Sequence, residues 1–205
     1  MQGKQVAEAL AVVRRMRLAV GDDVRFRGYS GRARWLSGAL VVAGAVNLSR
    51  VGGADLSTTL MVWGTVATLA ALANVAALCR WTLVEQNGDW RALAPVRHML
   101  VPLLVGATLT AGMVLRDAPD LLYGTWISAY GLANVASRRV LPREIAWIGM
   151  FYVVVGGLCL CLPGVGIGSI WVMAIVFGAG EAAAGRVLIR DHRRYQGLNE
   201  GRSAA

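Results

Sequence analysis

Charged residues are scarce in this chain. They make up 16% of its 205 residues, whereas hydrophobic residues make up 56%, and an ordinary soluble domain carries roughly 25% charged residues. Long polar stretches are also missing after the first thirty-odd residues, because apolar runs alternate with short segments that carry arginine. This pattern is typical of transmembrane helices. It leaves no room for a separate soluble domain and predicts one all-α membrane domain.

Lysine is almost absent, with Lys4 as its single instance among 21 Lys and Arg residues. The net charge of +9 could suggest nucleic-acid binding. However, the basic residues lie beside the ends of the apolar runs, where cations anchor a helix and set its orientation. We therefore expect the lipid bilayer, and no nucleic acid, as a partner.

Cysteine and histidine are too few for the sites that they commonly build. Cys79, Cys159 and Cys161 are odd in number and form no Cys-x-x-Cys motif, so no disulfide framework is expected. Cys159 and Cys161 are interpreted as small apolar residues of a helix. His98 and His192 do not make a metal site by themselves.

Catalytic motifs are also absent. The chain has no His-Glu-x-x-His, no Gly-x-Ser-x-Gly, no P-loop and no pair of aspartates inside an apolar run. The glycine-rich stretch Gly164–Gly168 is interpreted as a turn. The sequence therefore predicts a protein that is not an enzyme, and it indicates no cofactor and no soluble substrate.

What is present is a series of six apolar runs. They predict helices over Trp35–Leu48, Leu56–Cys79, His98–Leu115, Leu121–Ser137, Ile145–Leu162 and Ser169–Ile189. The first run is short for a span of about 20 residues. It would be long enough as Ala33–Val51 if Arg34 and Arg50 extend their guanidinium groups to the membrane surface.

The regions predicted on this basis are three. Residues 1–34 form a cytoplasmic or interfacial segment, residues 35–189 the six-helix transmembrane domain, and residues 190–205 a basic cytoplasmic tail. Nineteen of the 21 basic residues fall in the N-terminal segment, in every second loop and in the C-terminal end from Arg186 onward. Because positive residues mark the cytoplasmic face, we expect a multi-pass protein of the cell's inner membrane with both termini in the cytoplasm.

The N-terminal segment contains a candidate amphipathic helix over Gln5–Val20. Its apolar residues share one face at 100° per residue. One interpretation is a helix that lies on the membrane surface or docks a partner. The other is a short helix packed on the cytoplasmic end of the bundle. A signal peptide is not expected, because the first long apolar run begins only at Trp35, behind eight basic residues.

An internal repeat organises the apolar runs. Met61–Leu78 matches Leu121–Arg138 at seven positions, and Gly178–Val187 is a weaker third copy with Glu181 in the column of Asn74 and Asn134. We therefore expect three helical hairpins arranged as parallel pseudo-repeats. The second helix of each hairpin is rich in small residues, which permit close helix contact in lipid. These three helices are expected inside the bundle.

The polar candidates inside the membrane are Glu181, Asn74 and Asn134. A carboxylate at the middle of a membrane costs roughly 2.5–3.5 kcal/mol on insertion scales. One interpretation of Glu181 is a carboxylate that binds a proton or a cation in a cavity beside the two asparagines. The other is a glutamate that accepts hydrogen bonds from hydroxyls or pairs with a cytoplasmic arginine. The asparagines are better explained as hydrogen-bonding contacts between helices.

Several stretches between Val101 and Arg194 resemble a group of uncharacterised bacterial six-helix inner-membrane proteins. The stretches that carry the resemblance are Tyr123–Gly131, Arg139–Pro142, Gly149–Phe151, Gly156–Gly157 and Phe177–Gly185. The resemblance implies six helices and cytoplasmic termini. It implies no activity, because the group has no established one. It also implies that the Glu181 position, often histidine in the group, keeps an ionisable residue.

Two functions remain from these observations. The first is a non-catalytic integral membrane protein that serves as an accessory or structural subunit and packs against other membrane proteins. The second is a small transporter or channel with its polar centre at Glu181, Asn74 and Asn134. A subunit should co-purify with fixed partners, whereas a transporter should have a water-accessible cavity that reaches Glu181.

Overall fold

The structure is a computed structural model that describes residues 26, 28–52, 55–162, 164–166 and 168–203. The candidate amphipathic helix over Gln5–Val20 lies outside these residues. Within them the fold is all-helical, as predicted. The six α-helices are α2 (Gly31–Arg50), α3 (Leu56–Val84), α4 (Arg97–Leu115), α5 (Leu122–Ala136), α6 (Arg143–Cys161) and α7 (Ile170–Ser203).

The helices begin close to the predicted positions, but two of them end later. α3 continues past Cys79 to Val84, where a turn with Asn87 and Gly88 at positive φ follows. α7 continues from Ile189 to Ser203, so most of the predicted basic tail is helical. Arginine, tyrosine and glutamine are compatible with a helix, and no proline or glycine interrupts residues 190–196. The end of an apolar run therefore does not mark the end of these helices.

Side-chain caps define the starts of α2 and α3. The Ser30 hydroxyl accepts a hydrogen bond from the Ala33 N–H at 3.4 Å. The Asp55 carboxylate accepts one from the Ser57 hydroxyl and one from the Thr58 N–H at 2.9 Å. These hydrogen bonds lower the pKa of Asp55 to about 2. Both residues satisfy backbone donors that a helix start leaves without partners.

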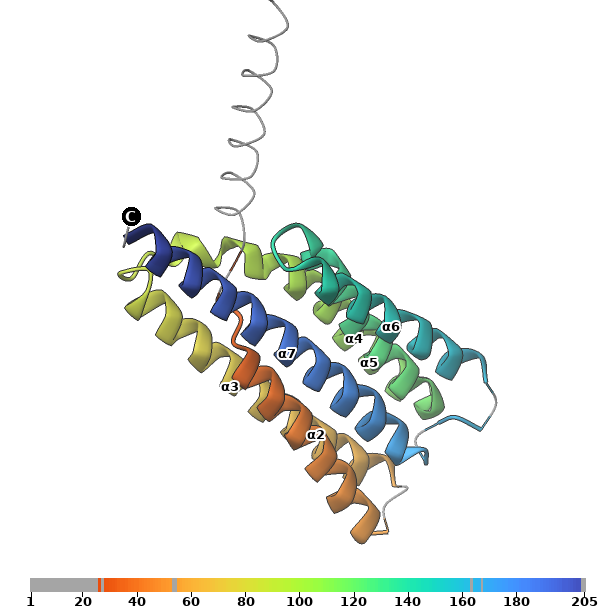
Figure 1. The fold of residues 1–205 in the computed structure, drawn as a ribbon. Helices are drawn as coiled ribbons and strands as arrows, with labels where there is room; N and C mark the ends of the chain where they lie inside the picture. The colour runs from red at the N-terminus through yellow and green to blue at the C-terminus, as the bar shows by residue number, and fades with distance from the viewer. Residues whose placement is uncertain (1–25, 27, 53–54, 163, 167, 204–205) are drawn as a thin grey trace, which may run out of the picture.

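The most extensive contacts are between α5 and α6 and between α2 and α7. α3 packs on α2 and α4 packs on α5, so these two helices lie at the outside of the bundle (Figure 1). The predicted partners α6 and α7 contact each other less than either contacts its main neighbour. The tightest packing is therefore between the predicted hairpins rather than within them.

Glycines explain why these two pairs approach so closely. A Cβ built on Gly131 of α5 would lie 2.7 Å from the carbonyl oxygen of Gly149 of α6. In the other pair, a Cβ on Gly38 of α2 would lie 3.1 Å from the Cβ of Glu181 of α7. In a membrane, close backbone approach and van der Waals contact supply most of the packing energy. The glycines therefore set which helices become neighbours.

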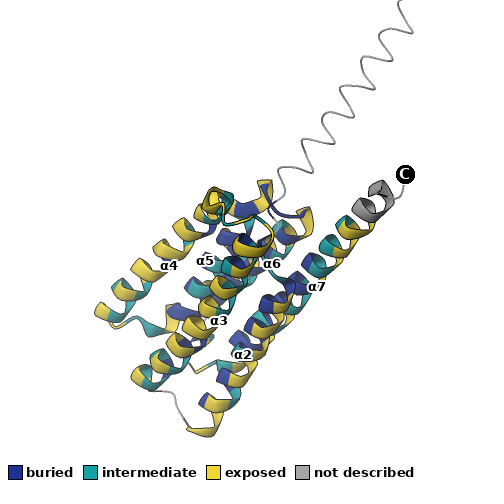
Figure 2. Cartoon of the chain, turned by 90° about the vertical axis from the view of Figure 1, so that its left-hand side faces the viewer, coloured by how far each residue is buried: buried dark blue, intermediate teal, exposed yellow. Residues whose placement is uncertain are grey.

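The prediction that α3, α5 and α7 form the interior is only partly correct. α5 and α7 are extensively buried, but α3 is not: only Thr59, Trp63, Val66, Leu78 and Thr82 are buried among its 29 residues. Figure 2 shows exposed residues along both α3 and α4. α3 is peripheral because the chain provides no further helix on its outer side among the described residues.

Four helical stretches are long and apolar enough to cross a membrane. They are Leu56–Val84, Trp90–Leu115, Arg143–Cys161 and Ile170–Gly197. The second of these combines α4 with the short 3₁₀ helix Trp90–Val96 that precedes it. By their length and composition, these stretches indicate a membrane-embedded protein. α2 and α5 pack against these stretches.

Candidate functional site

Arg34 lies in the first turn of α2 and points into the bundle. Its side chain is 3% exposed. The sequence-based expectation that Arg34 extends to the membrane surface is therefore wrong. The physical reason is an opposite charge across the interface: Nη1 of Arg34 lies 2.9 Å from Oε1 of Glu181, whose side chain is 1% exposed. A buried charge needs such a partner, because the alternative is an uncompensated charge in an apolar interior.

Two tyrosines complete the surroundings of this ion pair. The Tyr130 hydroxyl donates to Oε1 of Glu181 at 2.8 Å and accepts from Arg34 at 2.9 Å. The Tyr152 hydroxyl also donates to Oε1 of Glu181, at 3.3 Å. Three donors thus converge on one carboxylate oxygen. Hydrogen bonds to a charged acceptor are stronger than neutral ones, so the tyrosines help to fix the position of this carboxylate oxygen.

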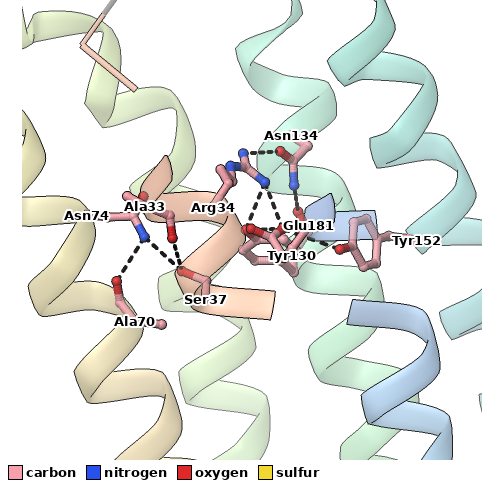
Figure 3. A network of polar contacts seen from close by, with 9 residues as sticks. All are labelled: Ala33, Arg34, Ser37, Ala70, Asn74, Tyr130, Asn134, Tyr152 and Glu181. Carbon is pink, nitrogen blue, oxygen red and sulfur yellow. Dashed lines mark hydrogen bonds and ion pairs between the residues drawn. The ribbon is translucent and has the colours of Figure 1, made fainter. Parts of the chain in front are cut away.

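Asn134 binds the other end of the guanidinium. Its Oδ1 accepts from Nη2 of Arg34 at 2.6 Å, and its Nδ2 donates to the backbone oxygen of Tyr130 at 2.9 Å. We call Arg34, Tyr130, Asn134, Tyr152 and Glu181 the polar cluster (Figure 3). It joins four helices, α2, α5, α6 and α7, and its two formal charges cancel. Its geometry suits a clamp that holds these helices in register.

One atom of the polar cluster is left over. Oε2 of Glu181 is buried and has no hydrogen-bond partner within the described part of the chain. A buried carboxylate oxygen in that state can accept a proton, a water molecule or a cation. The described residues contain no group of three His, Cys, Asp or Glu side chains that could hold a metal ion. The contacts match the interpretation in which Glu181 accepts hydrogen bonds from hydroxyls and pairs with an arginine. The other interpretation, in which Glu181 binds a proton or a cation, depends on the unpartnered Oε2.

Asn74, the third predicted candidate, does not join the polar cluster. Its Nδ2 donates to the Ser37 hydroxyl at 3.2 Å and to the backbone oxygen of Ala70 at 2.8 Å. Figure 3 shows it on the α3 side of α2, whereas Arg34 points toward α5 and α7. The structure thus brings Glu181 and Asn134 together through Arg34 and leaves Asn74 as a contact between α2 and α3.

Sequence reasoning missed Arg34, Tyr130 and Tyr152. A signal for Arg34 was available, since an acidic residue inside an apolar run calls for an opposite charge, and Arg34 lies at the start of another run. Tyr130 precedes Asn134 by one helical turn and so shares its face. Nothing in the sequence singles out Tyr152, because its role depends on how α6 packs against α7.

Two cavities in the described part of the chain lie away from the polar cluster. A groove of about 740 Å³ runs between α4 and α5, and a depression of about 390 Å³ lies beside the loop after α6. Neither is lined by a residue of the polar cluster. The buried ion pair therefore lies outside both cavities.

Searches against known protein families, curated proteins and solved structures find no match to this chain. The resemblance to six-helix inner-membrane proteins therefore stays a prediction.

Proposed function

We propose that the protein is a non-catalytic, six-span membrane protein that serves as an accessory or structural subunit and binds a helix of another membrane protein along α3. The observation that carries this proposal is that another helix covers one of the two repeat copies, whereas the same face of the other copy is exposed. On α5, the face formed by Gly124, Ser128, Gly131 and Val135 packs against Gly149 and Gly156 of α6. The corresponding face on α3 consists of Gly64, Thr68, Ala71 and Val75, and all four are exposed.

The contacts on α5 indicate what this pattern of small residues can hold. A Cβ on Gly124 would lie 2.9 Å from the backbone oxygen of Gly156, and a Cβ on Gly149 would lie 2.9 Å from a methyl carbon of Val135. On α3, by contrast, a Cβ on Gly64 would meet no described atom within 4 Å. Because small residues allow the close contact that drives helix association in lipid, the α3 face fits a partner helix of the α6 type.

The partner is a different membrane protein rather than a second copy. The helix that fits this pattern carries two glycines seven residues apart, as Gly149 and Gly156 do. In this chain that glycine face is already covered by α5. The partner therefore has to bring its own helix with small residues spaced by about two turns.

The proposed topology has six spans with both termini in the cytoplasm. It is supported by the four apolar stretches, by the packing of α2 and α5 among them, and by the arginine distribution. α5 has 15 residues and is roughly 22 Å long at about 1.5 Å per residue. It spans a thinned bilayer, or extends its reach through the short 3₁₀ helices at its two ends, Pro119–Leu121 and Ser137–Arg139.

A matched pair of substitutions on α3 tests the partner helix. Ala71 lies on the proposed face. Ala76 is also exposed, but it points about 110° away from the centre of the face formed by Gly64, Thr68, Ala71 and Val75. The full-length protein is isolated from its native membrane in mild detergent, and co-purifying membrane proteins are quantified. We expect Ala71→Leu to release a partner that the wild type and Ala76→Leu retain. Equal retention by both variants, or a wild type without any stoichiometric partner, contradicts the proposal.

The transporter remains as a second candidate because of the unpartnered Oε2 of Glu181. On this alternative, Glu181 carries a proton or a cation, with Asn74 and Asn134 along the path. It requires a water-filled route to the polar cluster. Flux measured in proteoliposomes decides: a proton or Na⁺ flux that Glu181→Gln abolishes favours the transporter, and no flux in the wild type favours the subunit.

A further inference from the structure

A groove lies between α4 and α5, and no residue of α3 lines it. Its floor is formed by small residues of α5, among them Ser128 and Ala129, and its walls by Val101 and Val105 of α4 and Leu160 of α6. The two helices are held together beside it, since the Trp126 indole donates to the Thr110 hydroxyl at 2.8 Å. The groove is therefore a fixed feature of the α4–α5 pair.

The two ends of the groove differ in charge. α4 and α5 are antiparallel, so the start of α4 and the end of α5 meet at one end, where His98, Arg138 and Arg139 line the groove. All three are exposed, and neither arginine has an ion-pair or hydrogen-bond partner in the part of the chain that is described. The opposite end is lined by Leu109, Thr125 and Leu160. A ligand that matches this surface has an anionic head and an apolar tail.

The length of the groove fits one leaflet of a bilayer. The lining residues of α5 extend from Thr125 to Ala136, which is roughly 16 Å at about 1.5 Å per residue. Half of the hydrocarbon core of a bilayer is about 15 Å thick. An acyl chain along α5 would thus reach the middle of the membrane while its head group stays beside the arginines.

We propose that this groove binds an anionic phospholipid, with its phosphate at Arg138 and Arg139 and an acyl chain along α5 between α4 and Leu160. Adjacent arginines present several N–H donors to one phosphate. Basic pockets between membrane helices select anionic lipids in this way. On the proposed topology the lipid belongs to the cytoplasmic leaflet, but the groove and its charge are the same for either orientation.

The head-group contact is tested with arginine variants of the full-length protein. The protein is purified in mild detergent and offered equal amounts of palmitoyl-oleoyl phosphatidylglycerol and phosphatidylethanolamine, and bound lipid is measured by native mass spectrometry. The test variant combines Arg138→Gln and Arg139→Gln. The matched control combines Arg193→Gln and Arg194→Gln, an exposed arginine pair near the end of α7 that changes the net charge equally.

We expect the wild type and the control to prefer phosphatidylglycerol. The preference should fall roughly 25-fold in the Arg138/Arg139 variant, because each basic residue near a membrane surface contributes about fivefold to binding of anionic lipid (~1 kcal/mol). Equal retention of the two lipids by the wild type overturns the proposal. So does an equal loss of preference in the test variant and the control.

The tail contact is tested at Leu132, which lines the groove and is 50% exposed. Leu132→Trp fills the groove and should remove bound lipid of both head groups. Leu72→Trp is the matched control, because Leu72 is the repeat counterpart of Leu132, is 59% exposed and lies on α3 outside the groove. An unchanged melting temperature shows that both variants fold. Release of a protein instead of a lipid by Leu132→Trp overturns the assignment.

Discussion

α3 and α5 carry the same sequence pattern and meet different environments. Asn134 of α5 is fully buried, whereas its counterpart Asn74 of α3 is half-buried. Thr125 is buried and its counterpart Thr65 is exposed. The cause is the neighbour: α6 covers the glycine face of α5, and α2 covers only the opposite side of α3. A pattern of small residues therefore provides the capacity for close packing, and a partner helix decides whether that capacity is used.

The two asparagines show where the likeness ends. Each donates its Nδ2 to the backbone oxygen four residues earlier, Asn74 to Ala70 at 2.8 Å and Asn134 to Tyr130 at 2.9 Å. This local contact is the same in both copies. The tertiary contact differs, because Asn74 meets the Ser37 hydroxyl and Asn134 meets the Arg34 guanidinium. The two copies also touch, where the Trp63 indole donates to the hydroxyl of its counterpart Tyr123 at 3.0 Å.

The largest effect is expected from removing the charge that distinguishes the α5 environment. Arg34→Ala leaves Glu181 as a buried, uncompensated charge, and breaking a buried pair in this way costs about 3–5 kcal/mol. The measurement is thermal unfolding of the purified protein in detergent. Arg34→Met combined with Glu181→Met should unfold at a higher temperature than Arg34→Ala, because no charge is left unpaired. A double variant no more stable than the single one would show that the ion pair does not organise the polar cluster.

The second effect compares the two asparagines directly. Asn134→Ala removes a hydrogen bond to a charged group and should cost about 1.5–3 kcal/mol. Asn74→Ala removes a neutral contact between helices and should cost about 0.6 kcal/mol. Unfolding of both variants under one set of conditions gives the difference. Equal losses would mean that the Arg34 contact adds nothing to what the repeat already provides.

The third effect compares two glycines at one repeat position. Gly124→Ala places a Cβ 2.7 Å from Leu160 and 2.9 Å from the backbone oxygen of Gly156, and overpacking of this kind costs about 1–3 kcal/mol. Gly64→Ala meets open space among the described atoms, and its gain in helix propensity is up to about 1 kcal/mol of stabilisation. Opposite signs are therefore expected in unfolding measurements of the isolated protein. A Gly64→Ala variant that is destabilised as much as Gly124→Ala would contradict the exposed α3 face.

The smallest effect concerns the helix starts. α3 has the Asp55 cap, whereas α5 has no side-chain cap hydrogen bond in the described structure. The pKa of Asp55 is lowered from 3.8 to about 2, so its contribution is complete above pH 4 and disappears as the pH falls through about 2. Amide hydrogen exchange at Thr58 should therefore become faster, relative to its intrinsic rate, between pH 4 and pH 2. Asp55→Asn, which caps without titrating, should show no such change.

Much of the helical framework was predictable from the sequence. The apolar runs, with polar turns such as residues 116–120 between them, gave the six helices and most of their starts. The ends of α3 and α7 were missed because a helix does not have to stop where its residues become polar. For the site, the repeat and the single acidic residue inside an apolar run pointed to Asn134 and Glu181. The predicted direction of the Arg34 side chain, toward the membrane surface, was wrong. Its charge can be stabilised either at the membrane surface or by an opposite charge, and the sequence is equally compatible with both.

By itself, then, the sequence determined that this chain forms apolar helices, which of them carry small residues, and that one carboxylate lies among apolar side chains. Only the tertiary structure decided which face of each helix is covered, which repeat copy obtained a neighbour, and which cation met Glu181. The physical reason is that lipid is as apolar as a protein interior. Hydropathy therefore does not mark the buried side of a membrane helix, and the close contacts of glycines such as Gly131 and Gly149 settle it instead.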